Sequence, residues 1–223
     1  MKNLKQLLYN FYTTERCSFN VSDGGGPFGF DIHHALEIDY LIKKYNIEKI
    51  VETGTNMGDT AEYLAKNYPK IKIITTETHK DFFNFSRKRL LKYLNVSILN
   101  ESSEKVVSVE DGRSLNTLYY LDAHWERYWP LKDEIKNIFK GVICVGDFNI
   151  NHYSFGYDQY NDIICDEKLV RDSGFTGKIY TNNPFCSSYK IPLLQTGRLG
   201  GRAYFCKNIS DDFMEFCDYF KVY

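Results

Sequence analysis

Short apolar runs alternate along the chain with segments whose apolar residues recur every three or four positions. The runs predict strands at 49–53, 71–77, 95–99, 117–122 and 142–147, and the other segments predict helices at about 33–45, 59–67, 80–93, 102–108 and 130–140. Strands that alternate with helices are typical of βαβ units, whose strands lie parallel. The pattern therefore predicts an α/β fold with a doubly wound, mostly parallel sheet.

The two ends of the chain depart from this alternation. Residues 1–12 have helical spacing and predict an amphipathic helix that docks on the core. Near the other end, a helix at about 160–173 precedes apolar segments at 178–182 and 202–207, and an amphipathic helix is expected at 211–220. The link between the two apolar segments is too short for a comfortable crossover. We expect them to pair antiparallel at one edge of a seven-stranded sheet.

No repeat, proline-rich linker or long charge run divides the 223 residues, so one domain is the simplest interpretation. Residues 1–47 are expected to form a helical cap or lid over a core of residues 48–223. Glycines at 24–26 and 29 suit the hinges of such a lid. A flexible lead-in is the alternative for this glycine-rich stretch.

Composition argues against several classes of protein. The chain has 28 basic and 29 acidic residues and a net charge of −1, which gives no argument for binding nucleic acid or an anionic membrane. No apolar run suits a signal peptide or a membrane span, so a cytoplasmic protein is expected. The six cysteines form no Cys-x-x-Cys pair, and we expect free thiols instead of a zinc or redox motif.

The first strand runs into a glycine turn and a helix start. Gly54 and Gly58 let the backbone turn sharply and approach a ligand, and Asp59 or Thr60 can cap the helix. The Gly-x-x-x-Gly spacing differs from the dinucleotide fingerprint and lacks the P-loop lysine, so phosphate is not the obvious ligand. Glu77 ends the next strand, where a carboxylate can accept hydrogen bonds from both ribose hydroxyls. Together these residues predict an adenosine-containing ligand, with an ordinary strand-to-helix turn as the alternative.

Further polar residues follow the third strand at the same predicted edge of the sheet. Glu101 can meet the amino group of an adenine ring, and a backbone amide near Ser102 can meet a ring nitrogen. A helix cap formed by Ser102 is the alternative.

Two aspartates, Asp122 and Asp147, end the strands at 117–122 and 142–147. Carboxylates that converge at one rim hold a divalent cation or share a proton. Asn149 offers another oxygen ligand, and His124 offers a third ligand or a general base. Structural roles are the alternatives, with Asp147 capping a loop and His124 packing on Trp125.

These motifs resemble those of a known family. The segment from Glu52 to Gly58 is similar to the first cofactor motif of class I S-adenosylmethionine-dependent methyltransferases, and Glu77 matches the acid of their second motif. The Leu-Asp-Ala-His-Trp segment at 121–125, with Asp147 downstream, resembles catechol O-methyltransferase-like, metal-dependent enzymes and methyltransferases associated with sugars and glycans. The resemblance covers residues 48–150 and implies a Rossmann-like fold.

The resemblance also implies roles for individual residues. Glu52 and Gly54 would meet the methionine part of the cofactor, Glu77 the ribose, and Glu101 with Ser102 the adenine. The cofactor site that it implies also includes Thr55, Asn56, Gly58, Thr60 and Asp122. A magnesium ion or another divalent cation would be held by Asp122, Asp147 and Asn149.

Two residues depart from the metal-dependent pattern. Phe148 separates Asp147 from Asn149, and Glu126 stands where the relatives carry a catalytic lysine. His124, acting with Asp122, is therefore the expected catalytic base.

The expected reaction is O-methylation of a hydroxyl, on a sugar or glycan in preference to a small phenol or catechol. A nicotinamide-dependent oxidoreductase and a non-catalytic binding module are the alternatives. The aromatic loop 152–160 and the glycine–arginine loop 197–202 are candidates to shape the acceptor site, although each also suits a purely structural loop. The amphipathic ends leave a homodimer open.

Overall fold

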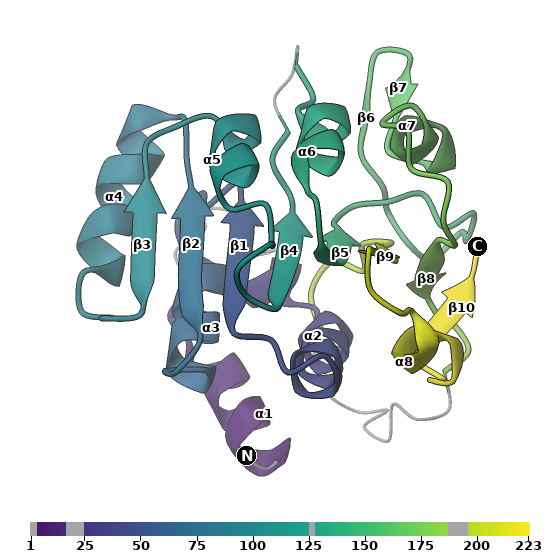
Figure 1. Ribbon diagram of the computed structural model, residues 1–223. Coiled ribbons are helices and arrows are strands. Elements are labelled where there is room, and N and C mark those ends of the chain that lie inside the picture. Colours follow the sequence, from purple (N-terminus) through teal and green to yellow (C-terminus); the bar gives the residue numbers. More distant parts are fainter. Residues whose placement is uncertain (1–3, 17–24, 125–127, 187–195) are drawn as a thin grey trace.

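A central sheet of eight strands organises the chain in the computed structural model, which describes residues 4–16, 25–124, 128–186 and 196–223 (Figure 1). The strand order is β10-β8-β9-β5-β4-β1-β2-β3, and β6 and β7 form a separate hairpin. The strands are β1 Lys49–Thr53, β2 Lys72–Thr76, β3 Val96–Leu99, β4 Thr117–Leu121, β5 Gly141–Val145, β6 Gln159–Tyr160, β7 Ile163–Ile164, β8 Tyr180–Asn182, β9 Ala203–Lys207 and β10 Phe220–Val222.

Helices cover both faces of this sheet. They are α1 Leu4–Thr13, the 3₁₀ helix η2 Pro27–Phe30, α2 Ile32–Lys44, α3 Asp59–Asn67, α4 Lys80–Leu90, α5 Ser103–Val109, α6 Leu131–Asn137, α7 Glu167–Arg171 and α8 Asp212–Glu215. Four residues named or counted above, Cys17, Gly24, Trp125 and Glu126, lie outside the described residues.

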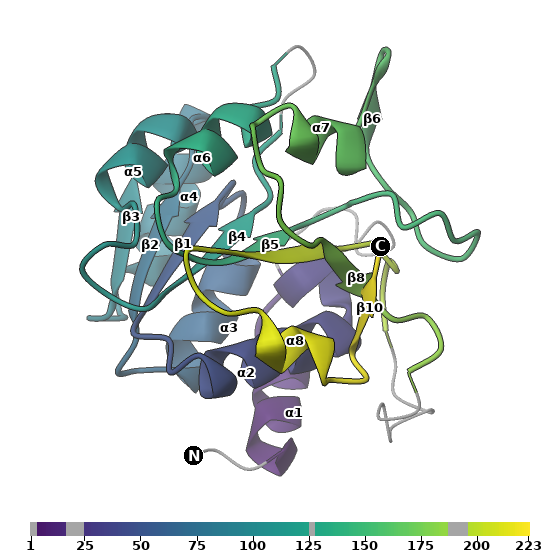
Figure 2. The ribbon, with the colours of Figure 1, turned by 45° about the vertical axis from the view of Figure 1, so that its right-hand side comes forward.

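Alternate side chains of the central strands enter two separate apolar cores. Ile50 and Ile73 pack in the core that contains side chains of α1, α2, α3 and α8. Their neighbours Val51 and Ile74 pack in the core that contains side chains of α5, α6 and α7 (Figure 2). Since both faces are covered, these strands consist of continuous apolar runs, as the sequence pattern requires.

The order of the sheet creates a crevice between β1 and β4. Strands β1 to β5 are mutually parallel, and the chain leaves β1 for β2 and β3 before it returns to β4 on the other side of β1. The carboxyl ends of β1 and β4 are therefore at a topological switch point, where open α/β sheets bind ligands. The predicted Rossmann-like, mostly parallel sheet is confirmed.

The antiparallel part of the sheet is larger than predicted. Strand β9 pairs antiparallel with both β5 and β8, as expected for a late hairpin, but β10 adds an eighth strand at the edge. The predicted helix at 211–220 is wrong beyond α8, because Phe220 is buried in the first core and β10 pairs with β8. The predicted helix at 160–173 is likewise reduced to α7, and part of its range forms the β6–β7 hairpin.

The N-terminal helix and the cysteines agree with expectation where they are described. Leu7 and Phe11 of α1 are buried in the first core, so this helix docks on the core by its apolar side. Cys144, Cys165, Cys186, Cys206 and Cys217 are free thiols. No helix within the described ranges is long and apolar enough to cross a membrane.

Glu134 of α6 brings an ionisable group into the second core. The side chain is fully buried, and neither carboxyl oxygen has a hydrogen-bond partner among the described residues. Burial raises the pKa of Glu134 to about 7, in spite of the nearby Ser103 and Thr53 hydroxyls, which lower it. Ionisation of this carboxyl therefore opposes folding.

We predict that Glu134→Gln makes the stability of the protein less dependent on pH between about 4.5 and about 7. Between the ordinary value of 4.5 and about 7 the folded protein retains a proton that the unfolded chain releases, so stability falls as pH rises. The loss from this one group is on the order of 3 kcal/mol above that range. Urea unfolding of wild type and variant across this range measures it, with Glu167→Gln, at a side chain that is 43% exposed, as control. An equal pH slope in wild type and Glu134→Gln would contradict the prediction.

Candidate active site

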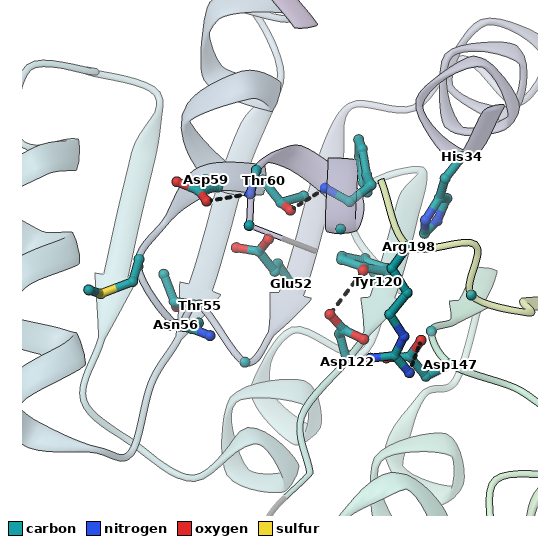
Figure 3. A pocket seen from close by; sticks show the side chains of 18 of the residues that line it. His34, Glu52, Thr55, Asn56, Asp59, Thr60, Tyr120, Asp122, Asp147 and Arg198 are labelled. Atoms are coloured by element: carbon teal, nitrogen blue, oxygen red, sulfur yellow. Dashed lines mark hydrogen bonds and ion pairs between the residues drawn. The ribbon is translucent and has the colours of Figure 1, made fainter. Parts of the chain in front are cut away.

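A cavity of about 310 Å³ opens at the carboxyl ends of β1, β4 and β5, at the switch point of the sheet (Figure 3). It is lined by Gly25, Gly26, Phe28, Gly29, His34, Glu52, Gly54, Thr55, Asn56, Met57, Asp59, Thr60, Tyr120, Asp122, His124, Gly146, Asp147, Arg198, Gly200 and Arg202. A second cavity of about 450 Å³ shares Gly54, Asn56, Asp122 and His124 with the first. The two cavities thus meet at the turn after β1 and the end of β4.

The glycine turn brings the end of β1 against the end of β4. Gly54 has φ +81°, and a Cβ atom there would lie 2.8 Å from the carbonyl oxygen of Asp122. The amides of Gly54 and Thr55 donate to the carbonyl of Thr76 at 3.1 and 3.0 Å, which ties the turn to β2. Gly58, at φ +78°, begins α3. Glycine is therefore required at position 54 for both its backbone conformation and its close approach to β4.

Glu52 presents a buried carboxyl to the first cavity. Its side chain accepts a hydrogen bond of 2.5 Å from the hydroxyl of Thr75, which also lies 2.5 Å from that of Thr55. Burial raises the pKa of Glu52 to about 8, and the Thr75 hydrogen bond opposes part of the shift. Glu52 is therefore largely protonated at neutral pH and can donate one hydrogen bond into the cavity.

Glu77 and the residues after β3 line the second cavity. The two carboxyl oxygens of Glu77 accept from the amides of Asn56 and His79, both at 2.8 Å. Glu101 and Ser102 line the same cavity, and the Thr76 hydroxyl donates to the Glu101 carbonyl at 2.5 Å. These predicted adenosine-binding residues therefore lie together.

Ser102 occupies the N-cap position of α5 but makes no side-chain cap hydrogen bond. Its hydroxyl is buried and has no hydrogen-bond partner among the described residues. Since buried polar groups are normally satisfied, this hydroxyl at the cavity wall suits a ligand group.

Asp59 and Thr60, at the start of α3, accept hydrogen bonds from another segment of the chain and do not cap their own helix. The amide of Gly26 donates to Asp59 at 2.8 Å, and the amide of Phe28 donates to the hydroxyl of Thr60 at 3.0 Å (Figure 3). The capping role predicted for Asp59 or Thr60 is therefore wrong. Both side chains instead hold η2 beside the cavity.

Asp122 and Asp147 both reach the first cavity, as the sequence predicts for strand ends. Asp122 is half-buried, accepts a 2.9 Å hydrogen bond from the Tyr120 hydroxyl, and has a pKa raised to about 7 by desolvation and then by the charge of Asp147. Burial also raises the pKa of Asp147, against the lowering effect of Arg198. Because two nearby negative charges repel each other, the carboxyl groups of Asp122 and Asp147 are not readily ionised at the same time.

His124 is held by a carboxylate that the sequence analysis does not single out. Its Nε2 lies 2.8 Å from Asp158 Oδ2, and its Nδ1 lies 3.2 Å from the Tyr160 hydroxyl. Burial lowers the pKa of His124, but the hydrogen bond to Asp158 and the surrounding carboxylates outweigh it, so the net shift is upward. The pKa of Asp158 is lowered, because its contacts with His124 and Arg198 outweigh burial.

Potential metal-ligand atoms of His124, Asp147 and Asp158 lie within 4.8 Å of one another. Arg198 Nη2, however, lies 3.0 Å from an oxygen of Asp147 and 3.0 Å from an oxygen of Asp158. Because a guanidinium already bridges two of the three ligands, the arrangement does not fit a resident divalent ion.

Asn149, predicted as a metal ligand, does not line either cavity. Its side-chain oxygen accepts from the amide of Asn151 at 2.9 Å. Asp158 takes the place near Asp147 that the sequence analysis assigns to Asn149.

Both loops that are predicted to shape the acceptor site bring side chains to His124 or to its partner Asp158. The loop 152–160 supplies Asp158 and Tyr160, and the loop 197–202 supplies Arg198. Arg202, by contrast, is buried and pairs with Glu37 and Asp31 at 2.8 and 2.6 Å, so its role is structural. Asp158 could have been predicted from the sequence, because it is a charged residue in one of these loops. Tyr120 could not, because only an apolar strand surrounds it in the sequence.

Comparison with solved structures identifies the fold. A SAM dependent methyltransferase from Aquifex aeolicus matches with a TM-score of 0.52 and 11% sequence identity, over 92% of this chain and 99% of that one. The chain has a methyltransferase fold. A putative O-methyltransferase from Nostoc punctiforme matches this methyltransferase fold with a TM-score of 0.51 and 10% identity, over 80% of this chain and 57% of that one. No family model and no curated protein matches the sequence.

We predict that Gly54→Ala destabilises the methyltransferase fold more than Gly174→Ala does. Both glycines have positive φ, +81° and +89°, but only an alanine at position 54 meets another group, the Asp122 carbonyl, whereas position 174 faces open space. The left-handed conformation costs each variant about 1 kcal/mol, and the clash adds about 1–3 kcal/mol at position 54. Urea unfolding of both variants checks this difference, and equal losses would contradict it.

Proposed function

We propose that the chain transfers a methyl group from S-adenosylmethionine to a hydroxyl group of a sugar or glycan. The observation that carries this proposal is His124, which lies on the wall shared by the two cavities and is held by Asp158 at 2.8 Å. A base at this position lies between a cavity suited to an adenosine and a cavity suited to a polar acceptor. The methyltransferase fold supports the choice of donor.

The second cavity supplies the groups proposed to hold the adenosine part of the donor. Glu77 is proposed to bind the ribose, and Glu101 with the unpartnered Ser102 hydroxyl the adenine. Gly54 lines both cavities where they meet. Glu52 and the glycine turn are proposed to meet the methionine part, while Thr60 contributes indirectly through η2.

His124 and Asp158 are proposed to act on the acceptor. When bound, S-adenosylmethionine supplies a methyl group that is already electrophilic. Asp158 accepts from Nε2–H, so the neutral ring keeps its lone pair on Nδ1. An acceptor hydroxyl that displaces the Tyr160 hydroxyl from Nδ1 can pass its proton to His124. Asp122 stays close to His124 and favours the imidazolium that results.

The chemistry of the first cavity favours a sugar over a phenol. Asp122, Asp147 and Arg198 can exchange hydrogen bonds with several hydroxyls, whereas a planar phenol needs an apolar slot. Outside the first cavity, the rings of Trp129 and Tyr160 lie 5.9 and 5.7 Å from the His124 ring, and Tyr160 lines the second cavity, so an aromatic surface stands beside the proposed base. Metal assistance, which the sequence resemblance implies, is not part of this proposal, because Arg198 already bridges Asp147 and Asp158.

Isothermal titration tests the donor. We expect S-adenosylmethionine and S-adenosylhomocysteine to bind and NAD not to bind. Glu77→Ala should weaken their binding by about tenfold or more, since it removes the carboxylate and releases the amides of Asn56 and His79. Glu48→Ala is a matched control, because Glu48 also accepts from a backbone amide, that of Asn116, but away from the cavities. Binding of NAD alone would favour an oxidoreductase, and binding of none a non-catalytic module.

Methyl transfer from labelled S-adenosylmethionine to panels of oligosaccharides and catechols tests the base. We expect His124→Ala to lower kcat by about 10²–10⁴-fold with little change in donor affinity. The wild-type rate should fall as pH drops below the raised pKa of His124, because the base must be neutral. Asp158→Asn should shift this fall to lower pH, since it removes the partner that raises the pKa. An unchanged kcat in His124→Ala would overturn the assignment.

A further inference from the structure

Arg198 is placed as a bridging cation in the first cavity. A single nitrogen, Nη2, lies 3.0 Å from Asp147 Oδ1 and 3.0 Å from Asp158 Oδ1 (Figure 3 shows Arg198 beside Asp147). Asp158 in turn contacts His124 through its other oxygen at 2.8 Å. The guanidinium therefore meets the same carboxylate groups that a divalent ion at His124, Asp147 and Asp158 would need.

The backbone around Arg198 is built to hold this position. The amide of Gly156 donates to the Leu199 carbonyl at 2.8 Å, and the amide of Gly201 donates to the Gly156 carbonyl at 2.8 Å. A Cβ at Gly200 would lie 2.6 Å from Asp147 Oδ1, so the loop can approach this carboxylate only with glycine there. The carboxylates are also joined, since the amide of Asp158 donates to the Asp147 carbonyl at 2.9 Å. These contacts distinguish Arg198 from a surface arginine that pairs by chance.

The charges around Arg198 oppose a second cation. The guanidinium is permanently charged. Burial lowers its pKa, but the contacts with Asp147 and Asp158 raise it by more, so the net shift is upward. An ion bound to these oxygens would have to displace Arg198 or tolerate its positive charge at contact distance. Since one nitrogen makes both carboxylate contacts, the guanidinium keeps N–H donors for an oxygen in the cavity.

We infer that Arg198 takes the place of a catalytic metal ion: it neutralises Asp147 and Asp158 and donates to the acceptor oxygen, so that methyl transfer requires no divalent cation. This inference rests on the proposed function for the role of the acceptor oxygen. As the acceptor O–H proton passes to His124 Nδ1, the oxygen forms its bond to the methyl carbon and the carbon–sulfur bond breaks. Arg198 stabilises the negative charge that develops on the oxygen, as metal ions do in other enzymes.

Binding of Mn²⁺ alone tests the inference without an acceptor, so failure of the proposed function does not affect the outcome. We expect calorimetry to detect no Mn²⁺ binding to the full-length wild-type protein at millimolar concentrations. Arg198→Gln removes the charge but keeps a long polar side chain, and should bind Mn²⁺ at least about tenfold more tightly than wild type. Arg198→Lys keeps the charge and should still exclude the ion. Arg113→Gln, which breaks an exposed pair with Asp111, is the remote control.

The site is verified by adding Asp147→Asn to Arg198→Gln, which should abolish the gained Mn²⁺ binding. The inference is overturned if the wild type binds Mn²⁺ and Asp147→Asn removes that binding, or if a folded Arg198→Gln variant gains none. If Arg198→Gln does not fold, the wild type, Asp147→Asn and Arg198→Lys provide the test. Mn²⁺ binding by the wild type or by Arg198→Lys that is lost with Asp147→Asn overturns the inference. If neither the wild type nor Arg198→Lys binds Mn²⁺, the inference is supported.

Discussion

The contact between the turn after β1 and the end of β4 determines where both cavities lie. It depends on a glycine at position 54, since a Cβ there would lie 2.8 Å from the Asp122 carbonyl. Asp122 and its neighbour Ala123 are also tied to the end of β1, because their amides donate to the hydroxyl of Thr53. One backbone approach therefore sets both the wall of the second cavity and the direction in which the residues after β4 leave the sheet. His124 owes its position to that direction.

Burial of acidic groups is the second constraint on the site. Asp122 and Asp147 follow β4 and β5, whose sides are covered by apolar cores, and Asp158 lies just before β6; desolvation disfavours the charged form of all three. Such a group of acids must keep protons or acquire positive partners. This chain uses both solutions, since the pKa of Asp122 is raised to about 7 whereas Asp158 is paired with His124 and Arg198.

The sequence predicts the parts of the molecule that depend on local pattern. Apolar runs identify β1, β2, β4 and β5, and the positions just after them identify Gly54, Glu77, Asp122 and Asp147, because parallel strands bring their carboxyl ends to one edge. It does not predict Asp158 or Arg198, which reach the site through loop contacts between distant segments. The short strand β10 is missed for a related reason: its pairing with β8 overrides the helical spacing of the apolar residues before it.

The contact between η2 and the loop before β9 limits when the first cavity can form during folding. The Phe30 carbonyl accepts from the Thr196 hydroxyl, 166 positions further along the chain, and from the amide of Gly197. The first cavity is therefore complete only after these two segments have packed against each other. A chain that has not yet been synthesised as far as Gly197 has no such cavity, so ligands cannot engage it before that segment is made and folded. Once formed, the occupied cavity links the two segments and raises the stability of the whole molecule by mass action.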